Sequence, residues 1–222
     1  MRIEIKNIAK RFKKHQVLRD ICLTADSGCC IGILGSNGSG KSTLLSILAG
    51  IQNCDNGSFL CDGAELLNNS RKRSQVVGYV PQGTPLIEEL SAKDNLLLWY
   101  SRAELKKELE DGVLALLGIG DFLSVTVSKM SGGMKKRLSI GCAMSSHPPV
   151  LLLDEPTAAL DLVCKQKIAS YLRHYKENCG ILLLTTHDAM ELDLCDEWFI
   201  IQDGVLVPFH FDGDIQKLVE NL

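Results

Sequence analysis

The sequence lacks any long apolar run, and this absence limits where the chain can work. A helix that crosses a bilayer needs roughly 18 to 20 successive apolar residues, and no such run occurs among the 222 residues. Residues 1–6 alternate apolar and charged side chains, which is typical of a strand and unlike a secretory signal. We therefore expect a cytoplasmic protein whose role at any membrane comes through a partner.

Metal-binding cysteine spacing is also missing. The nine cysteines are scattered, without CxxC pairs or Cys/His clusters, which argues against a structural zinc site. We expect most of them to be small core residues in a reducing cytosol. The net charge of −3 gives no electrostatic reason to expect nucleic acid as a partner. The short basic run at residues 10–15 is interpreted as a solvated strand end and turn.

Four short apolar runs predict the buried strands of an α/β protein with a mainly parallel sheet. They cover residues 30–34, 76–80, 150–153 and 181–185. Each run is too short for a helix, and several lead into Gly, Pro or acidic positions, as parallel strands do. Helices are expected between them, over residues 41–49 with an end at Gly50, and over residues 163–176.

The segment before residue 62 has a different pattern. Residues 3–8, 17–24 and 57–61 are expected to form antiparallel strands joined by turns. Gly- and Asp-containing turns are predicted at residues 26–28 and 62–63. The fold class is therefore an α/β core with an N-terminal antiparallel β part.

A helical insertion is predicted within this core. From about residue 91 to residue 146 strand signals vanish, and helical segments such as residues 103–117 dominate. We therefore predict one domain over residues 1–222. Its α/β core would comprise residues 1–83 and 147–222, and residues 84–146 would form a helical lobe.

A glycine-rich segment between an expected strand and helix carries the strongest local signal. It matches the P-loop pattern G-x-x-x-x-G-K-[ST], in which backbone N–H groups and the helix N-terminus attract phosphate. Lys41 can reach the β- and γ-phosphates, and the Ser42 hydroxyl can bind Mg²⁺. A Gly-rich turn without ligand is the alternative, which the strand, the Lys-Ser pair and the helix argue against. The candidate residues are Gly35, Ser36, Asn37, Gly38, Ser39, Gly40, Lys41, Ser42 and Thr43.

An acidic pair follows another apolar run. A buried strand would deliver Asp154 to the carboxyl end of the sheet, where it can hold Mg²⁺, usually through water. Glu155 beside it is a candidate general base for the attacking water. A solvated turn is the alternative for such a pair on its own. Together with the P-loop, however, the pair is a far more specific sign of a nucleoside triphosphate site than either motif alone.

A third motif precedes the acidic pair. Residues 130–134 read Met-Ser-Gly-Gly-Met and continue into Lys-Lys-Arg. This segment resembles the signature motif of ABC-family ATPases, with Met at two positions where the family commonly has Leu and Gln. Ser131, Gly132 and Gly133 would offer a hydroxyl and N–H groups near the start of a helix expected over residues 138–144, which are parts suited to an anion.

Further matches follow in the order of that family. Gln82 resembles the Q-loop glutamine, and Asp161 resembles the D-loop aspartate. His187 resembles the switch histidine, and Phe12 lies where an aromatic ring stacks on adenine. Alone each residue would more often be structural, but their order and spacing around the two nucleotide motifs favour the family over P-loop kinases and GTPases. The resemblance extends from about residue 3 to residue 204.

The resemblance implies how the chain would work. ATP and Mg²⁺ would be its cofactors, with Gln82 as a further Mg²⁺ ligand. Glu155, His187 and Gln82 would act in catalysis. The signature and Asp161 of one subunit would close over ATP held by the P-loop of a second ABC ATPase subunit, giving a homodimer. The other expected partners are integral-membrane permease subunits, which would place the chain on the cytoplasmic face of the membrane.

Two finer points concern the kind of ABC protein. Residues 134–139 and 186–196 are most similar to the ATPases of the ABC-2 exporter group. A soluble ABC ATPase, for example of the cofactor-assembly type, is the alternative function, because such proteins are also short single cassettes.

Overall fold

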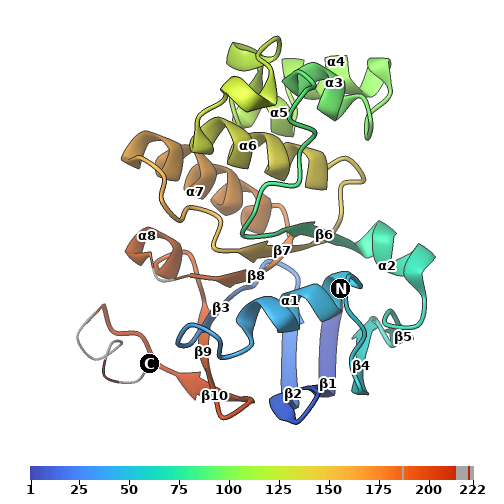
Figure 1. The fold of residues 1–222 in the computed structure, drawn as a ribbon, viewed down its shortest axis with the longest axis vertical. Helices are drawn as coiled ribbons and strands as arrows, with labels where there is room; N and C mark the ends of the chain where they lie inside the picture. Colours follow the sequence, from blue (N-terminus) through green and yellow to red (C-terminus); the bar gives the residue numbers. More distant parts are fainter. Residues whose placement is uncertain (187, 214–219, 221–222) are drawn as a thin grey trace.

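A single ten-stranded sheet organises the computed structural model, which describes residues 1–186, 188–213 and 220 (Figure 1). The strand order is β5-β4-β1-β2-β10-β9-β3-β8-β7-β6. The strands are β1 (Arg2–Phe12), β2 (His15–Asp26), β3 (Cys30–Leu34), β4 (Asn56–Cys61), β5 (Ala64–Glu65), β6 (Val77–Val80), β7 (Val150–Asp154), β8 (Ile181–Thr185), β9 (Glu197–Gln202) and β10 (Val205–Phe209).

Helices cover this sheet and extend beyond one end of it. They are α1 (Lys41–Ala49), α2 (Ser70–Val76), α3 (Ala92–Leu96), α4 (Arg102–Glu110), α5 (Val113–Leu116), α6 (Gly132–Ala143), α7 (Leu162–Glu177) and α8 (Ala189–Leu192), with 3-10 turns at Ile119–Phe122 and Val127–Lys129. Within the described part of the chain, none of these helices is long and apolar enough to cross a membrane.

The central strands are buried on both faces. β9, β3, β8, β7 and β6 pair in parallel, and the apolar runs predicted four of these five strands, all except β9. Successive side chains of a strand point to opposite faces, so Leu151 and Leu153 join the core below α7, whereas Val150 and Leu152 pack on the side of α1. These two hydrophobic layers hold α1 and α7 on opposite faces of the sheet (Figure 1).

The antiparallel part forms as expected but with longer strands. β1 pairs with β2 and β4, and the turns at residues 26–28 and 62–63 are present. β9 and β10 were not predicted, although residues 198–201 are apolar and Asp203-Gly204 forms the turn between them. The strand expected at residues 76–80 begins at Val77, because Val76 ends α2.

Helices α3 to α6 gather at one end of the molecule (Figure 1), within the range predicted for the helical lobe; we retain the division into core and lobe as a proposal. The prediction of a single helix over residues 103–117 was wrong, because the helical conformation is interrupted between α4 and α5. The carboxylate of Glu108 accepts a hydrogen bond from Val113 N at 2.9 Å. A Cβ at Gly112 would lie 2.7 Å from the backbone Cα of Glu108, so the break favours glycine.

Candidate nucleotide site

The P-loop connects β3 to α1 at the carboxyl end of the parallel strands. Gly35, Gly38 and Gly40 have φ values of 148°, 83° and 110°, which side-chain-bearing residues rarely adopt. A Cβ at Gly35 would lie 2.6 Å from Ser39 Oγ, and one at Gly40 would lie 2.9 Å from Leu18 Cδ2. The predicted helix is confirmed, and it ends at Gly50 in the left-handed region.

Lys41 lies inside this loop and is only 6% exposed. Its ammonium donates hydrogen bonds to Gly35 O at 2.6 Å and to Ser36 O at 3.1 Å. Burial lowers the pKa of Lys41, while the negative charges of Glu155 and Asp154 act in the opposite direction. A buried cation against curled backbone has the chemistry that binds phosphate, so these residues fit the phosphates of a nucleotide.

Asp154 and Glu155 both depend on a threonine of the neighbouring strand. Thr185 donates a hydrogen bond from Oγ1 to Asp154 Oδ1 at 2.7 Å, and the same oxygen accepts one from Glu155 N at 3.0 Å. Asp154 is 3% exposed, and Glu155 has a φ of 47°. Such a left-handed backbone in a non-glycine residue costs energy and is concentrated at functional sites. Sequence patterns gave no sign of Thr185's role.

Gln82 reaches the acidic pair from the end of β6. Its Nε2 donates a hydrogen bond to Glu155 Oε2 at 2.9 Å, which joins residues far apart in the sequence. Both side chains line a cavity of about 270 Å³ together with the P-loop. The structure therefore brings the predicted Gln82, Glu155, Lys41 and Ser42 to one place. The P-loop members of the lining are Asn37, Gly38, Gly40, Lys41, Ser42 and Thr43.

The β1–β2 hairpin lies beside this cavity. His15 and Val17 of β2 line it, and neither was predicted as a site residue. Phe12 pairs with His15 across the hairpin and is 40% exposed, and the Lys10 ammonium lies 5.5 Å from the centroid of its ring. Because Phe12 is outside the cavity lining, its stacking on adenine stays a prediction.

Ser131 is the N-cap of α6, so the helix expected from residue 138 starts earlier, at Gly132. The Ser131 Oγ accepts a hydrogen bond from Met134 N at 3.3 Å. Asp161 caps α7 by accepting one from Cys164 N at 2.9 Å, and that backbone contact lowers the pKa of Asp161. A Cβ at Gly133 would lie 2.3 Å from Cys164 Sγ, so the two helix starts are in tight contact. Among the described residues, those lining the P-loop cavity include neither cap.

His187, the predicted switch histidine, lies outside the described residues. The neighbouring residues Thr186 and Asp188 take part in a hydrogen bond and an ion pair. Lys165 of α7 forms an ion pair with Asp188, and Asp188 N donates to Thr186 Oγ1 at 2.9 Å. Glu191 follows in α8 and is 2% exposed. It lines a second cavity, of about 210 Å³, which also reaches Glu155.

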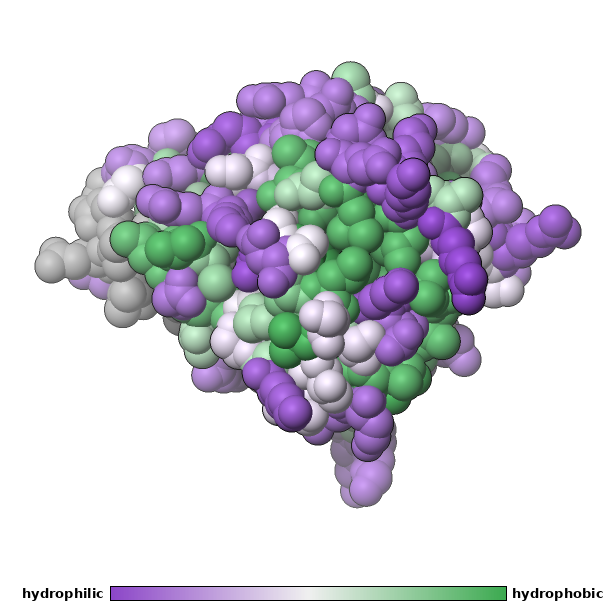
Figure 2. Space-filling view, turned by 90° about the horizontal axis from the view of Figure 1, so that it is seen from above, coloured by the Kyte–Doolittle hydropathy of each residue, from purple (hydrophilic) through white to green (hydrophobic). Residues whose placement is uncertain are grey.

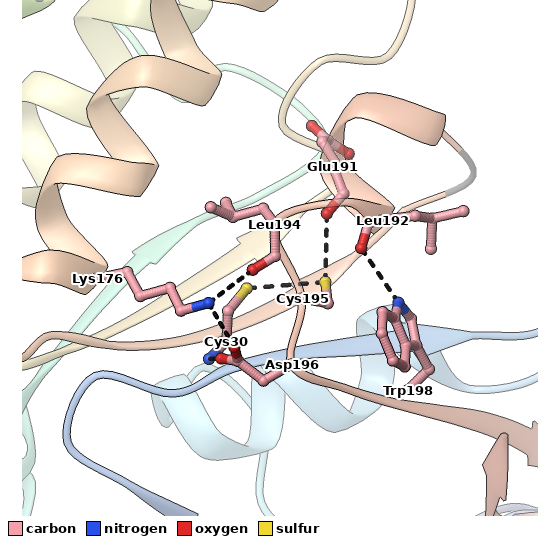
Figure 3. Close-up of polar contacts among 8 residues, drawn as sticks. All are labelled: Cys30, Lys176, Glu191, Leu192, Leu194, Cys195, Asp196 and Trp198. Carbon is pink, nitrogen blue, oxygen red and sulfur yellow. Dashed lines mark hydrogen bonds and ion pairs between the residues drawn. The ribbon is translucent and has the colours of Figure 1, made fainter. Parts of the chain in front are cut away.

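Polar contacts anchor the strand that carries the P-loop (Figure 3). Asp196 accepts hydrogen bonds from Cys30 N at 2.8 Å and from Lys176 Nζ at 2.5 Å. Lys176 also donates to Leu194 O at 3.1 Å. The thiols of Cys30 and Cys195 lie 3.7 Å apart. That contact, together with burial, raises the pKa of Cys30, which keeps it a neutral core residue, as predicted.

The fold and the site define an α/β P-loop nucleoside triphosphatase. A family model described as ABC transporter matches residues 18–158, so the chain belongs to the ABC transporter family. It binds and hydrolyses ATP as a member of that family. The predicted family and enzyme class are therefore confirmed.

Curated relatives cover nearly the whole chain. It is 36% identical to a Nod factor export ATP-binding protein of Sinorhizobium fredii over 91% of its length and 60% of the relative. The identity is 31% with a linearmycin resistance ATP-binding protein of Bacillus subtilis, over 96% of the chain and 70% of the relative. A methionine import ATP-binding protein of Clostridioides difficile is 34% identical over 97% of the chain and 70% of the relative.

Solved structures agree with the fold. A dimeric ATP-binding cassette in a post-hydrolysis state, bound to ADP and phosphate, has a TM-score of 0.81 and 26% identity, covering 96% of this chain and all of that one. An ATP-binding subunit of an ABC transporter has a TM-score of 0.83 and 26% identity, covering 99% of this chain and 94% of that one.

Glu191 predicts an unusual dependence of stability on pH. Burial raises its pKa to about 7, with Asp188 acting in the same direction and the Thr186 hydroxyl and Lys165 in the opposite one. Lys136 and Glu155 are its other charged neighbours. Because the folded pKa exceeds the unfolded value, the folded state binds more protons, and stability falls as pH rises from about 4.5 to about 7.

We expect Glu191→Gln to remove this loss. Its free energy of unfolding relative to the wild type should rise by up to about 3 kcal/mol between pH 5 and pH 8. Urea unfolding at the two pH values measures the change, and the exposed Glu177→Gln is the matched control. An equal difference from wild type at both pH values would contradict the prediction.

Proposed function

We propose that the chain is the ATP-hydrolysing motor subunit of a transporter whose membrane part is separately encoded, with ATP bound between two copies of the chain. One observation carries this proposal. Two anion-binding elements, the P-loop with Lys41 and the Ser131 cap of α6, lie on one chain but line no common cavity among the described residues. A two-fold pair of chains gives each nucleotide one of each element.

The residues at the P-loop also fit Mg²⁺. No cluster of three His, Cys, Asp or Glu side chains suited to a metal occurs among the described residues, but Mg²⁺ in ATPases takes few protein ligands and several phosphate and water oxygens. Ser42 and Gln82 would hold it, with Asp154 acting through water. The ion would neutralise charge that develops on the phosphates. Glu155 would accept the proton of the attacking water, and His187 would act beside it.

Glu155→Gln tests the general base. The variant should keep ATP affinity but hydrolyse ATP roughly 10²-fold or more slowly, because an amide cannot take the proton. Equilibrium ATP binding and phosphate release measure the two effects. Glu110→Gln, which removes an exposed carboxylate of the lobe, should behave like the wild type. Turnover close to wild type in Glu155→Gln would refute the assignment.

Mixing inactive variants tests the shared site. In a dimer of Lys41→Ala with Ser131→Arg, one composite site carries both lesions and the other carries none. Random exchange should therefore restore up to about a quarter of wild-type ATPase activity. Lys41→Ala mixed with Ser42→Ala is the control, because both lesions fall in the same half of the site and no activity should return. Absence of recovery in the first mixture, with exchange demonstrated, would exclude the two-chain site.

The helical lobe is the proposed docking surface for the permease. Large apolar side chains are exposed there, at Ile87, Leu98, Trp99 and Leu116, with Trp99 63% exposed. Figure 2 shows apolar side chains gathered among charged ones on the lobe end of the molecule. An exposed apolar patch of this kind marks an interaction site, and a transporter motor must contact a membrane partner.

This surface is connected to both halves of the nucleotide site. The segment that follows Gln82 pairs with the segment that precedes Ser131, through hydrogen bonds from Val127 N to Leu90 O at 2.9 Å and from Ser128 N to Glu88 O at 3.0 Å. A change of nucleotide at either half of the site could therefore move the lobe, and with it a partner that is bound there.

A photo-crosslinking residue tests the docking surface. Placed at Trp99 in cells, it should yield adducts with a membrane protein of several spanning segments, identified by mass spectrometry of isolated membranes. The same group at Val207, which is 39% exposed on β10, is the matched control. Membrane adducts from Val207 alone would refute docking through the lobe. Soluble adducts alone from Trp99 would favour a non-transport ABC ATPase.

Export through an ABC-2 type permease is the direction that we propose. The Met-Lys-Lys-Arg-Leu-Ser continuation after the signature glycines supports it. So does the relative whose name specifies Nod factor export. The position of the chain on the cytoplasmic face of the membrane is part of the same proposal.

A further inference from the structure

Lys136, two residues beyond the signature segment of residues 130–134, is a buried cation. It lies in α6, is 4% exposed, and its Nζ donates hydrogen bonds to Pro81 O and Gln82 O, each at 2.9 Å. Burying a charge is costly unless it is paired and hydrogen-bonded. These hydrogen bonds connect α6 of the helical lobe to the segment that follows β6.

The charges that balance Lys136 belong to the nucleotide site. Burial lowers the pKa of Lys136, and the negative charges of Asp154, Glu191 and Glu155 act in the opposite direction. Lys135, the next residue, has a different environment. It forms a surface ion pair with Glu88 at 3.1 Å, and surface pairs of this kind contribute little.

Gln82 is held at both ends. Lys136 binds its backbone carbonyl, and its own side-chain amide donates to Glu155 Oε2 at 2.9 Å. The helix that carries Lys136 begins at the Ser131 cap. A continuous series of contacts therefore runs from Ser131 through α6, Lys136 and Gln82 to Glu155.

We propose that Lys136 is a positioning residue that fixes Gln82 against Glu155 and transmits movement of α6 to it. The inference rests on the proposed roles of Gln82 and Glu155. When α6 shifts with the lobe, Lys136 moves the two carbonyls and with them the side chain of Gln82. Hydrolysis is then fast only when α6 is positioned so that Ser131, at its N-terminus, can contact the nucleotide bound to a second subunit.

Lys136→Met tests this in the full-length protein, with Lys135→Met as the matched control. A catalytic group displaced by about 1 Å can cost roughly 10²-fold in rate, so we expect kcat to fall roughly 10- to 100-fold in Lys136→Met with ATP affinity within about 3-fold of wild type. Lys136→Arg keeps donors for both carbonyls and should restore most of the rate. Lys135→Met should match the wild type.

A double-mutant cycle separates positioning from general support of the fold. If Lys136 acts through Gln82, adding Lys136→Met to Gln82→Ala should change kcat less than about 3-fold, because coupled residues are not additive. An equal loss in both backgrounds, or a Lys136→Met protein indistinguishable from Lys135→Met, would overturn the proposal.

Two further measurements distinguish a failure to fold, and a failure of the proposed function, from a failure of the role proposed for Lys136. If Lys136→Met does not fold by circular dichroism, the same cycle is run with Lys136→Gln, and additive losses there would overturn the proposal. Glu155→Gln is assayed in parallel. If it retains turnover, the proposed function fails; if it is inactive and the cycle is additive, only the role of Lys136 fails.

Discussion

The register of the parallel strands β3, β8, β7 and β6 determines where every central group of the site lies. Asp154 pairs with Thr185, Thr185 pairs with Ile33, and Val80 pairs with Leu153. All four strands therefore end at one edge, with the P-loop, Thr186, Glu155 and Gln82 just beyond it. A slip of one residue would turn every side chain to the opposite face, and it would separate the Thr185 hydroxyl from the Asp154 carboxylate.

Charge balance is the second constraint on this edge. Lys41 and Lys136 are both buried, and both donate to backbone carbonyl groups of loops that follow strands. Asp154 and Glu155 influence both ammonium groups. The cations and carboxylates therefore lie close together at this edge, beside the loop that would hold phosphate. Charge fixed in position in this way is the main source of rate enhancement in many enzymes.

Sequence patterns were sufficient for the features that arise locally. The P-loop, its helix and the buried strands follow from glycine spacing and apolar runs, and those elements form where predicted. Patterns were insufficient where a contact joins distant segments. His15, Thr185 and Lys136 gain their contacts with the site from strand pairing and helix packing, which leave no spacing signal in the chain. The break between α4 and α5 was missed because it depends on the Glu108 side chain folding back onto Val113 N.

The contact between Gly133 and Cys164 has a consequence for assembly. Because a Cβ at Gly133 would lie 2.3 Å from the Cys164 sulfur, the start of α6 packs directly against a side chain at the start of α7. Ser131 and Asp161, each hydrogen-bonded as a helix cap, are therefore presented on one rigid block. Association costs conformational entropy whenever mobile groups must be ordered at an interface. In the proposed dimer, a second subunit that meets this block would lose little entropy there, so more of the energy of nucleotide binding would be available to hold the two chains together.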